Sequence, residues 1–257
     1  MERFFPASAM WLSLIHIYAR IILAWTAIGK NPQDVAGYDF LERLDDMENV
    51  CRQGINGPIW ALIAFDCGGY KMPDSRANDP VSREALVSVI LEAQLSDGSW
   101  GLVDQSSDVD LTAMALTALA PYYLNEEEAN QIQQDTLAAV HSAVDAGLTW
   151  LSEQQKDSGG FESWGSENAE SIAQVLTALS ALDLDGDKES LFVKKEGSVL
   201  DALLSFQTEE GGFSHEKSGE TNQMASEQCC YALAAYDRFC RGESRLYDCL
   251  LYTARCV

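Results

Sequence analysis

A short turn motif occurs three times in this chain, and each copy is followed by an apolar helical segment. The motif consists of Gln, three further residues, Gly, then Ser or Gly, and finally Trp or Phe. The glutamines Gln94, Gln155 and Gln207 are 61 and 52 residues apart. A unit of that length that recurs along a chain indicates a repeat architecture, in which each unit packs on its neighbours. The motif positions are Gln94, Gly98, Trp100, Gln155, Gly159, Phe161, Gln207, Gly211 and Phe213.

Apolar residues recur at helical spacing through most of the chain, and no alternating strand pattern stands out. The sequence therefore predicts an all-α fold. Hydrophobic residues make up 47% of the chain, which is enough for a sizeable core. We expect inner helices near residues 19–29, 57–66, 110–120, 170–182 and 225–239. We expect outer helices within residues 82–94, 125–155 (with a break near Gly147) and 198–207, and an amphipathic helix over 39–50.

The formal net charge of −23 bears on the partners of this chain. Such a surface repels phosphates, so we expect no nucleic-acid partner and no binding to anionic membranes. Seven cysteines include no CxxC pair, and three histidines are too few for a convincing metal site, so we predict no metal. Disulfides and the redox compartment cannot be inferred from this cysteine pattern.

An acidic or amide residue begins four of the predicted inner helices in register: Asn56, Asp110, Glu170 and Glu227. One interpretation is helix capping, since such residues complement the positive end of a helix. The other is a polar rim that binds a ligand. In either case we expect the helix ends to keep the carboxylates ionised. The candidate ligand-binding residues are Asn56, Trp60, Asp108, Asp110, Glu170, Gln174, Asn222, Glu227, Gln228 and Tyr231.

Four aromatic residues have two open interpretations: they line a pocket, or they pack between helices and turns. They are Trp60, Trp100, Trp164 and Tyr231.

The two ends of the chain differ from its middle. The stretches LSLIHI near the start and CLLYTARCV at the end resemble translated sequencing-adapter read-through. We therefore expect residues 1–18 to be a non-native or disordered leader, residues 249–257 to be a non-native tail, and residues 19–248 to form the repeat domain. The native export signal and any additional domains would then be missing, and we expect no membrane insertion by this fragment.

The segment from Gly147 to Phe161 is similar to the QW repeat of squalene–hopene cyclases, whose pattern is Gly-x2-aromatic-Leu-x3-Gln, a short spacer, and Gly-x-Trp or Phe. The copies that end at Trp100 and Phe213 match it in part. The resemblance covers residues 19–248 and implies an α/α toroid, in which inner helices form a barrel and outer helices surround it. The motif is specific for this fold and says little about activity.

Two enzymatic branches of that superfamily have motifs that this chain matches only in part. Residues 108–113 resemble the DxDDTA proton-donor motif of class II terpene cyclases, with Asp110 at the middle position and Asp108 before it. Leu111 replaces the second Asp, and alkene protonation needs an assisting acid, so the change argues against cyclisation. Glu227-Gln228-Cys229 resembles the zinc element of protein prenyltransferase β subunits, but no His follows it, so the third ligand is missing.

Two binding branches are the most similar. Residues 109–122 resemble a helix start of the α-domain of intrinsic factor and transcobalamin, and residues 53–66, 91–102 and 224–228 resemble secreted Gram-positive surface proteins with prenyltransferase/squalene-oxidase repeats. These resemblances imply a non-catalytic, extracellular or cell-surface module that needs no cofactor and binds a small polar ligand, such as a cobalamin-like molecule or a glycan. A terpene cyclase and a structural or adhesive surface domain remain the alternatives.

Overall fold

The computed structural model describes residues 14–52, 54–74, 77–102, 106–124, 127–163 and 165–249. Trp164, one of the aromatic candidates, and residues 250–257 of the expected tail lie outside this part of the chain. Strand pairing in the described residues is limited to a hairpin of two short strands and isolated bridges. The strands are β1 (Glu162–Ser163) and β2 (Ser166–Glu167). The predicted all-α class is therefore confirmed.

The chain divides into two compact units, which are described separately. Unit 1 comprises residues 1–92, 130–136 and 247–257, and unit 2 comprises residues 93–129 and 137–246.

Unit 1 is built around one helix that is buried on all sides. Every residue of α4 from Gly57 to Asp66 is buried, and the helix packs against α2, α3 and α5. Gly57 allows the contact with α3, because a Cβ atom at this position would lie 1.8 Å from the carbonyl oxygen of Val50. The elements of unit 1 are α2 (Leu14–Ala27), η1 (Leu41–Leu44), α3 (Met47–Cys51), α4 (Asn56–Asp66) and α5 (Arg83–Glu92).

A buried ion pair holds α5 to the end of α4. Arg83 Nε lies 2.7 Å from Asp66 Oδ1, and the exposed fractions of the two side chains are 3% and 9%. The same guanidinium group donates to the carbonyl oxygens of Phe65 and Tyr70, both at 3.0 Å, and to Gln131 Oε1 at 3.1 Å. The buried charge is thus surrounded by acceptors, as a charge removed from water must be.

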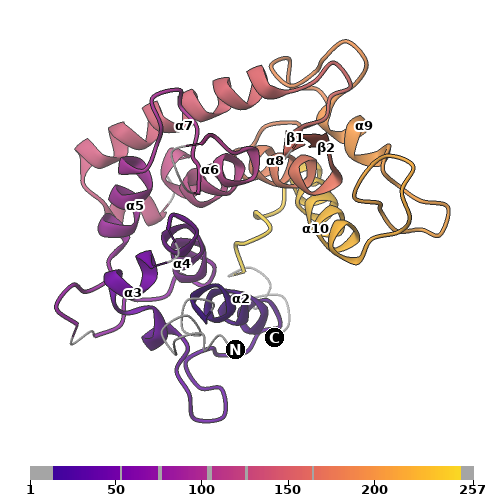
Figure 1. The fold of residues 1–257 in the computed structure, drawn as a ribbon. Coiled ribbons are helices and arrows are strands. Elements are labelled where there is room, and N and C mark those ends of the chain that lie inside the picture. The colour runs from indigo at the N-terminus through magenta and orange to yellow at the C-terminus, as the bar shows by residue number, and fades with distance from the viewer. Residues whose placement is uncertain are drawn as a thin grey trace, which may run out of the picture. The chain divides into compact units, whose positions relative to one another are not determined.

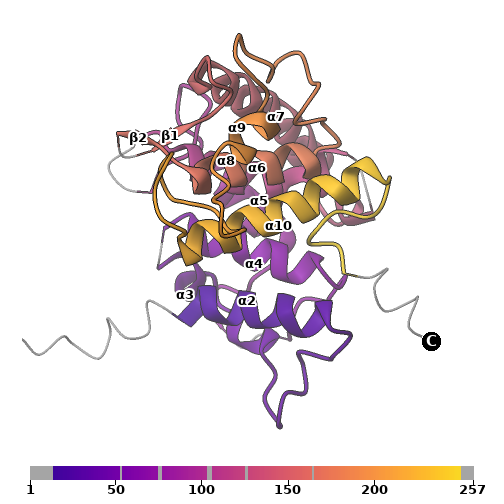
Figure 2. The ribbon, with the colours of Figure 1, turned by 90° about the vertical axis from the view of Figure 1, so that its right-hand side faces the viewer.

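Unit 2 has α8 at its centre. All thirteen residues of α8 are buried, and the helix packs against α6, α9 and α10. Both views show α6, α8 and α10 side by side, and Figure 1 shows the long α7 running past α6 (Figures 1 and 2). The remaining elements are α6 (Val109–Tyr123), η2 (Glu127–Gln131), α7 (Gln134–Gln154), α8 (Ala169–Ala181), α9 (Val199–Leu204) and α10 (Gln223–Cys240).

The repeated turn joins an outer helix to the next inner helix, as its sequence predicts. In the first copy the side-chain amide of Gln94 donates to the carbonyl oxygens of Gly98 at 2.9 Å and Ala143 at 2.8 Å. In the second copy Gln155 donates to Gly159 and to Phe192, both at 2.8 Å. Three of the four accepting carbonyl groups lie in turns, where they have no partner within a helix, and the fourth, that of Ala143, lies inside α7.

The aromatic residue of each turn is buried beneath the following helix. Trp100 and Phe161 are fully buried, and Phe213 is 5% exposed. Trp100 packs against α7 at Gly147, where an added Cβ would lie 3.0 Å from the indole ring. Of the two interpretations for Trp100, packing between helix and turn is therefore correct.

The third copy of the turn keeps the backbone hydrogen bond of the turn but lacks the hydrogen bonds of the glutamine side-chain amide. Thr208 N–H donates to the carbonyl oxygen of Gly212 at 2.9 Å, as Lys156 N–H does to that of Gly160. The side chain of Gln207 is exposed, however, and makes no hydrogen bond to a described residue. The prediction of three equivalent motifs is therefore wrong for this side chain.

The predicted helices are present, with three differences. The expected helix over residues 39–50 is instead the 3-10 helix η1 followed by the short α3. The first helix begins at Leu14 rather than at residue 19, and α7 passes through Gly147 without a break. Because Gly147 has no side chain, Trp100 and Leu116 can approach α7 at this point. This glycine therefore allows close packing and does not bend the helix.

Candidate functional site

The inner helices of unit 2 are capped by residues that precede the predicted acids, by two residues in α6 and α8 and by five in α10. Asp108 Oδ1 accepts from Leu111 N–H at 2.8 Å, and Asn168 Oδ1 accepts from Ser171 N–H at 2.9 Å. Asn222 caps α10 in the same way, through the N–H groups of Met224 and Ala225. The capping residues are thus Asp108, Asn168 and Asn222, and Asp110 and Glu170 each lie two residues inside the helix.

The predicted register is wrong for Glu227 and for Asn56. Glu227 lies five residues after its cap and is exposed, because α10 begins at Gln223. Asn56 is the first residue of α4 and does not cap it; Ile55 occupies the cap position, without a side-chain bond. Neither residue therefore shares the position of Asp110 and Glu170.

Polar side chains from α6, α8 and α10 meet in the interior of unit 2. Asp110 of α6 is close to Ser171 and Glu170 at the start of α8, and Gln174 lies one turn further along the same face of α8. The loop before α10 adds a histidine, and α10 adds an amide and a phenol. We call this group the polar cluster; it consists of Asp110, Glu170, Ser171, Gln174, His215, Gln228 and Tyr231.

The carboxyl of Asp110 in the polar cluster has a raised pKa. Burial raises the pKa of its carboxyl to about 6; contact with the Ser171 hydroxyl offsets part of the shift, and the nearby carboxylates of Asp108 and Glu170 add to it. We expected the start of the helix to keep this acid ionised, and the shift runs in the opposite direction. The correction has a simple physical reason: neighbouring helices remove water from the carboxylate, and desolvation outweighs the helix end.

Two buried atoms of the cluster lack a regular hydrogen bond. Asp110 Oδ1 and Ser171 Oγ are both shielded from solvent; the Ser171 hydroxyl contacts the Asp110 carboxyl, and neither atom makes a regular hydrogen bond to another described residue. Ser171 is fully buried. Buried polar atoms in native proteins are nearly always satisfied, so a buried pair with no regular hydrogen bond to other residues is unusual.

The rest of the polar cluster is tied together by hydrogen bonds. Glu170 Oε2 lies 2.8 Å from His215 Nδ1. The amide of Gln174 donates to Gln228 Oε1 at 3.0 Å and to the hydroxyl of Tyr231, which in turn donates to Gln228 at 3.4 Å. Burial decreases outward, from Gln174 at 8% exposed to the half-exposed His215.

The structure brings together five of the ten candidate ligand-binding residues in the polar cluster: Asp110, Glu170, Gln174, Gln228 and Tyr231. Asp108 and Asn222 are helix caps, and Glu227 is exposed on α10. Asn56 and Trp60 belong to unit 1, where the Trp60 ring packs edge-on against Tyr247 and under the guanidinium of Arg20.

Sequence reasoning missed Ser171 and His215. Ser171 directly follows the candidate Glu170. A serine inside a predicted buried helix does not by itself indicate a functional role. His215 lies two residues after the aromatic of the third turn, and its backbone carbonyl accepts from Ala169 N–H at 3.1 Å. Its position next to that aromatic was the available signal, since the turn predicts proximity to the preceding inner helix.

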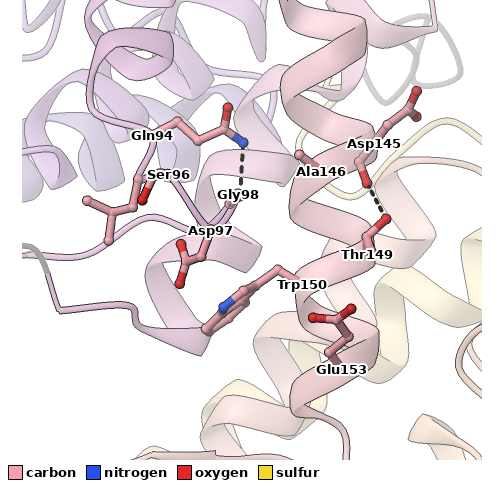
Figure 3. A pocket seen from close by; sticks show the side chains of 10 residues that line it. Gln94, Ser96, Asp97, Gly98, Asp145, Ala146, Thr149, Trp150 and Glu153 are labelled. Carbon is pink, nitrogen blue, oxygen red and sulfur yellow. Dashed lines mark hydrogen bonds between the residues drawn. The ribbon is translucent and has the colours of Figure 1, made fainter.

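A separate pocket lies on the surface of unit 2, beside the first repeat turn. Its volume is about 490 Å³, and it is bordered by the turn residues Gln94 and Gly98 and by residues of α7 (Figure 3). Asp97, Trp150 and Glu153 line it. None of the ten candidate residues does. Slight burial acts to raise the pKa of Asp97, but hydrogen bonds from Ser107 and Ser99 hold it below its usual value.

Two further features concern metal binding and membrane insertion in the described part of the chain. No group of three or more His, Cys, Asp or Glu residues there is arranged to hold a metal ion. No helix in that part combines the length and apolar character that crossing a membrane requires.

Comparison with known proteins supports the fold. Residues 59–145 and, again, residues 135–245 match the prenyltransferase alpha-alpha toroid domain. A search among curated proteins finds no match. The two matched segments together span well over half of the chain, and they cover α4 to α10 with all three repeat turns. This chain therefore belongs to the prenyltransferase alpha-alpha toroid domain family.

Proposed function

We propose that this chain is a non-catalytic, extracellular or cell-surface binding module, and that its polar cluster binds a small ligand bearing hydroxyl or amide groups. A cobalamin-like molecule and a glycan are the ligand classes in view. The observation that carries the proposal is the buried pair Asp110 Oδ1 and Ser171 Oγ, which make no regular hydrogen bond outside their contact with one another.

The chemistry of the cluster favours a neutral polar ligand. Asp110 offers an acceptor, and the Ser171 hydroxyl can donate or accept. The adjoining network of Gln174, Gln228 and Tyr231 contains amide and phenol groups, which also combine donor and acceptor. A ligand hydroxyl or amide has the same dual character, so it can satisfy both kinds of group at once. Acids predominate over bases here, which disfavours an anionic ligand.

Equilibrium binding tests the proposal. Cyanocobalamin and an N-acetylglucosamine tetrasaccharide serve as probes of the two classes, and isothermal titration calorimetry is the readout. We expect one probe to bind, and Asp110→Asn and Ser171→Ala each to weaken binding by roughly 10-fold or more, as the loss of a hydrogen bond to a buried group does.

Glu153→Gln is the matched control, because it changes an acid of the separate surface pocket. Loss of binding in Glu153→Gln, with normal binding in Asp110→Asn, would move the site to that pocket. If neither probe binds, the adhesive or structural alternative is favoured.

One observation favours a class II terpene cyclase as a second candidate. Alkene protonation requires a protonated carboxylic acid, and the raised pKa of Asp110 moves this group in that direction. The replacement of the assisting acid by the buried Leu111 argues against it. Incubation with squalene distinguishes the two: a cyclised product that disappears in Asp110→Asn would replace the binding function by the cyclase function.

A further inference from the structure

The surface pocket beside the first repeat turn carries chemistry of its own, separate from the polar cluster. It lies within unit 2, between turn residues 94–98 and residues 145–153 of α7, and its volume is about 490 Å³. Pockets of this size hold small ligands or single side chains with their backbone. The lining includes three acidic residues, Asp97, Asp145 and Glu153, and no Lys, Arg or His. A group that enters the pocket therefore meets negative charge.

Trp150 gives the pocket a buried hydrogen-bond donor. This residue lines the pocket and is only 7% exposed. Its indole N–H donates to no described residue, yet the nitrogen is not sealed off from solvent. Figure 3 shows the ring extending from α7 toward the turn, beside Asp97. A buried indole N–H usually has a hydrogen-bond partner, so this one is available to an acceptor that enters the pocket.

The carboxylates of the pocket are not neutralised by a cation of the described chain. Asp97 Oδ1 accepts from the backbone N–H of Ser99 at 3.1 Å and from its hydroxyl at 2.7 Å, and Oδ2 accepts from the hydroxyl of Ser107 at 2.5 Å. Hydrogen bonds of this kind favour the ionised form. Glu153 is exposed and forms no ion pair with a described residue. Both groups can therefore pair with a cation from outside.

The second repeat turn holds a peptide N–H at the position where the first turn has none. The carbonyl oxygen of Asp157, two residues after Gln155, accepts from the N–H of Glu196 at 2.9 Å. Ser96 has the same position after Gln94, but its carbonyl accepts from no described residue. The second turn faces the loop before α9, whereas the first faces α7, whose N–H groups are bonded within the helix. The first pocket therefore offers an unpaired carbonyl.

We propose that this pocket binds an extended, Lys- or Arg-bearing segment of a partner protein. The segment's backbone donates an N–H to the Ser96 carbonyl and accepts from the Trp150 indole. Its ammonium or guanidinium group pairs with Asp97 and Glu153, and its methylene stem covers the apolar part of the wall. This site is distinct from the polar cluster, so the proposal goes beyond the binding of a small neutral ligand.

The combination of groups selects a peptide over a polyamine. A polyamine supplies cationic donors for the carboxylates and for the Ser96 carbonyl, but it has no acceptor for the indole N–H. A basic residue within a peptide supplies the cation, the N–H donor and the carbonyl acceptor together. The net charge of −23 draws any cation toward the chain, so the contact with Trp150 is what marks the site.

A capped peptide, Ac-Ala-Ala-Lys-Ala-Ala-NH2 with a fluorescent label, is the probe, and fluorescence anisotropy with the full chain at low salt measures its affinity. The same peptide with norleucine in place of lysine is the reference, and spermidine is the competitor. We expect the lysine peptide to bind roughly 5-fold more tightly than the reference, and spermidine to displace it poorly. Equal affinity of the two peptides would overturn the proposal, as would displacement by an equal concentration of spermidine.

Two substitutions locate the site. Trp150→Phe keeps a ring but removes the N–H, and it should weaken binding about 3–10-fold. Glu153→Gln should weaken it by roughly 3-fold. Glu216→Gln is the matched control, because it removes the same charge from an exposed position of unit 2 outside the pocket, and it should bind as wild type does.

A spectroscopic readout follows the indole directly. In a chain with isotope-labelled tryptophan, the indole N–H resonance that Trp150→Phe removes should move when the peptide binds. An unmoved resonance would refute the contact, and an equal loss of affinity in Glu216→Gln would show unspecific attraction to the acidic surface. Because Glu153 is exposed, Glu153→Gln decides between site and surface even if Trp150→Phe fails to fold.

Discussion

The backbone N–H of Asp108 donates to the carbonyl oxygen of Trp100 at 2.9 Å, which joins the aromatic residue of a repeat turn to the cap of the helix that follows. The same bond recurs in the next two repeats, from Asn168 and from Asn222. It fixes where each inner helix begins, because the cap cannot shift without breaking it. The structural repeat is therefore set by the caps and not by the acids two residues later.

Phe161 tests the role of the aromatic in the repeat turn. Its ring is fully buried, so Phe161→Ala should lower the free energy of unfolding by about 3–5 kcal/mol, through lost burial and the cavity left behind. Urea denaturation measures the change. The control is Leu204→Ala on α9, which is 44% exposed and should cost much less. Similar losses in both variants would contradict a stapling role for the ring.

Alanine substitutions at two glycines of the repeat turns can distinguish the cost of backbone strain from the cost of a steric clash. Gly159 and Gly211 have nearly the same backbone angle, with φ values of +86° and +89°. A Cβ at Gly159 would lie 2.2 Å from the carbonyl oxygen of Ser198, whereas nothing lies within 4 Å at Gly211. Gly211→Ala should therefore cost only about 1–2 kcal/mol of strain, and Gly159→Ala about 2 kcal/mol more. Equal melting temperatures for the two variants would show that the turn relaxes.

The buried ion pair of unit 1 should be sensitive to loss of its cation. Arg83→Met leaves Asp66 buried without its charged partner, so we expect the free energy of unfolding to fall by about 3–5 kcal/mol. Arg52→Met is the matched control, since Arg52 pairs with Glu48 at the surface and should contribute less than about 1 kcal/mol. Guanidinium is unsuitable here because it screens charges; urea unfolding at low salt is the appropriate measurement.

The raised pKa of Asp110 predicts a pH dependence of stability with a definite sign. Between about pH 4 and pH 6 the folded chain holds the Asp110 proton more tightly than the unfolded chain, so stability falls as the pH rises through this window. Above the window the full penalty is present, and below it the penalty vanishes. Asp110→Asn removes the charge, so it should stabilise the chain at pH 7 by about 2–3 kcal/mol and leave it nearly unchanged at pH 4.

The measurement is the difference in unfolding free energy between wild type and Asp110→Asn at several pH values, since the difference cancels the other titrating groups. The exposed Asp157→Asn serves as control and should show no comparable trend. A variant that is less stable than wild type by the same amount at pH 4 and pH 7 would mean that the charge of Asp110 is not strained by burial.

The sequence by itself determined the helical class and the positions of the repeat turns. These depend on local patterns: apolar spacing sets each helix, and the turn needs its glycine and its aromatic within seven residues. The first acceptor of the Gln155 amide, Gly159, lies four residues away within the motif, whereas the second, Phe192, is 37 residues away and comes from the tertiary structure.

Only the tertiary structure decided which polar residues meet. Whether Glu227 faces inward depends on where α10 begins, and the Asn222–Phe213 bond sets that start. The pKa of Asp110 is raised because neighbouring helices remove water from its carboxyl group. The spacing of residues along one helix does not predict this effect. Glu170 and His215 are 45 residues apart in sequence. Such contacts depend on how helices pack against one another, and that is a property of the assembled core rather than of any one segment.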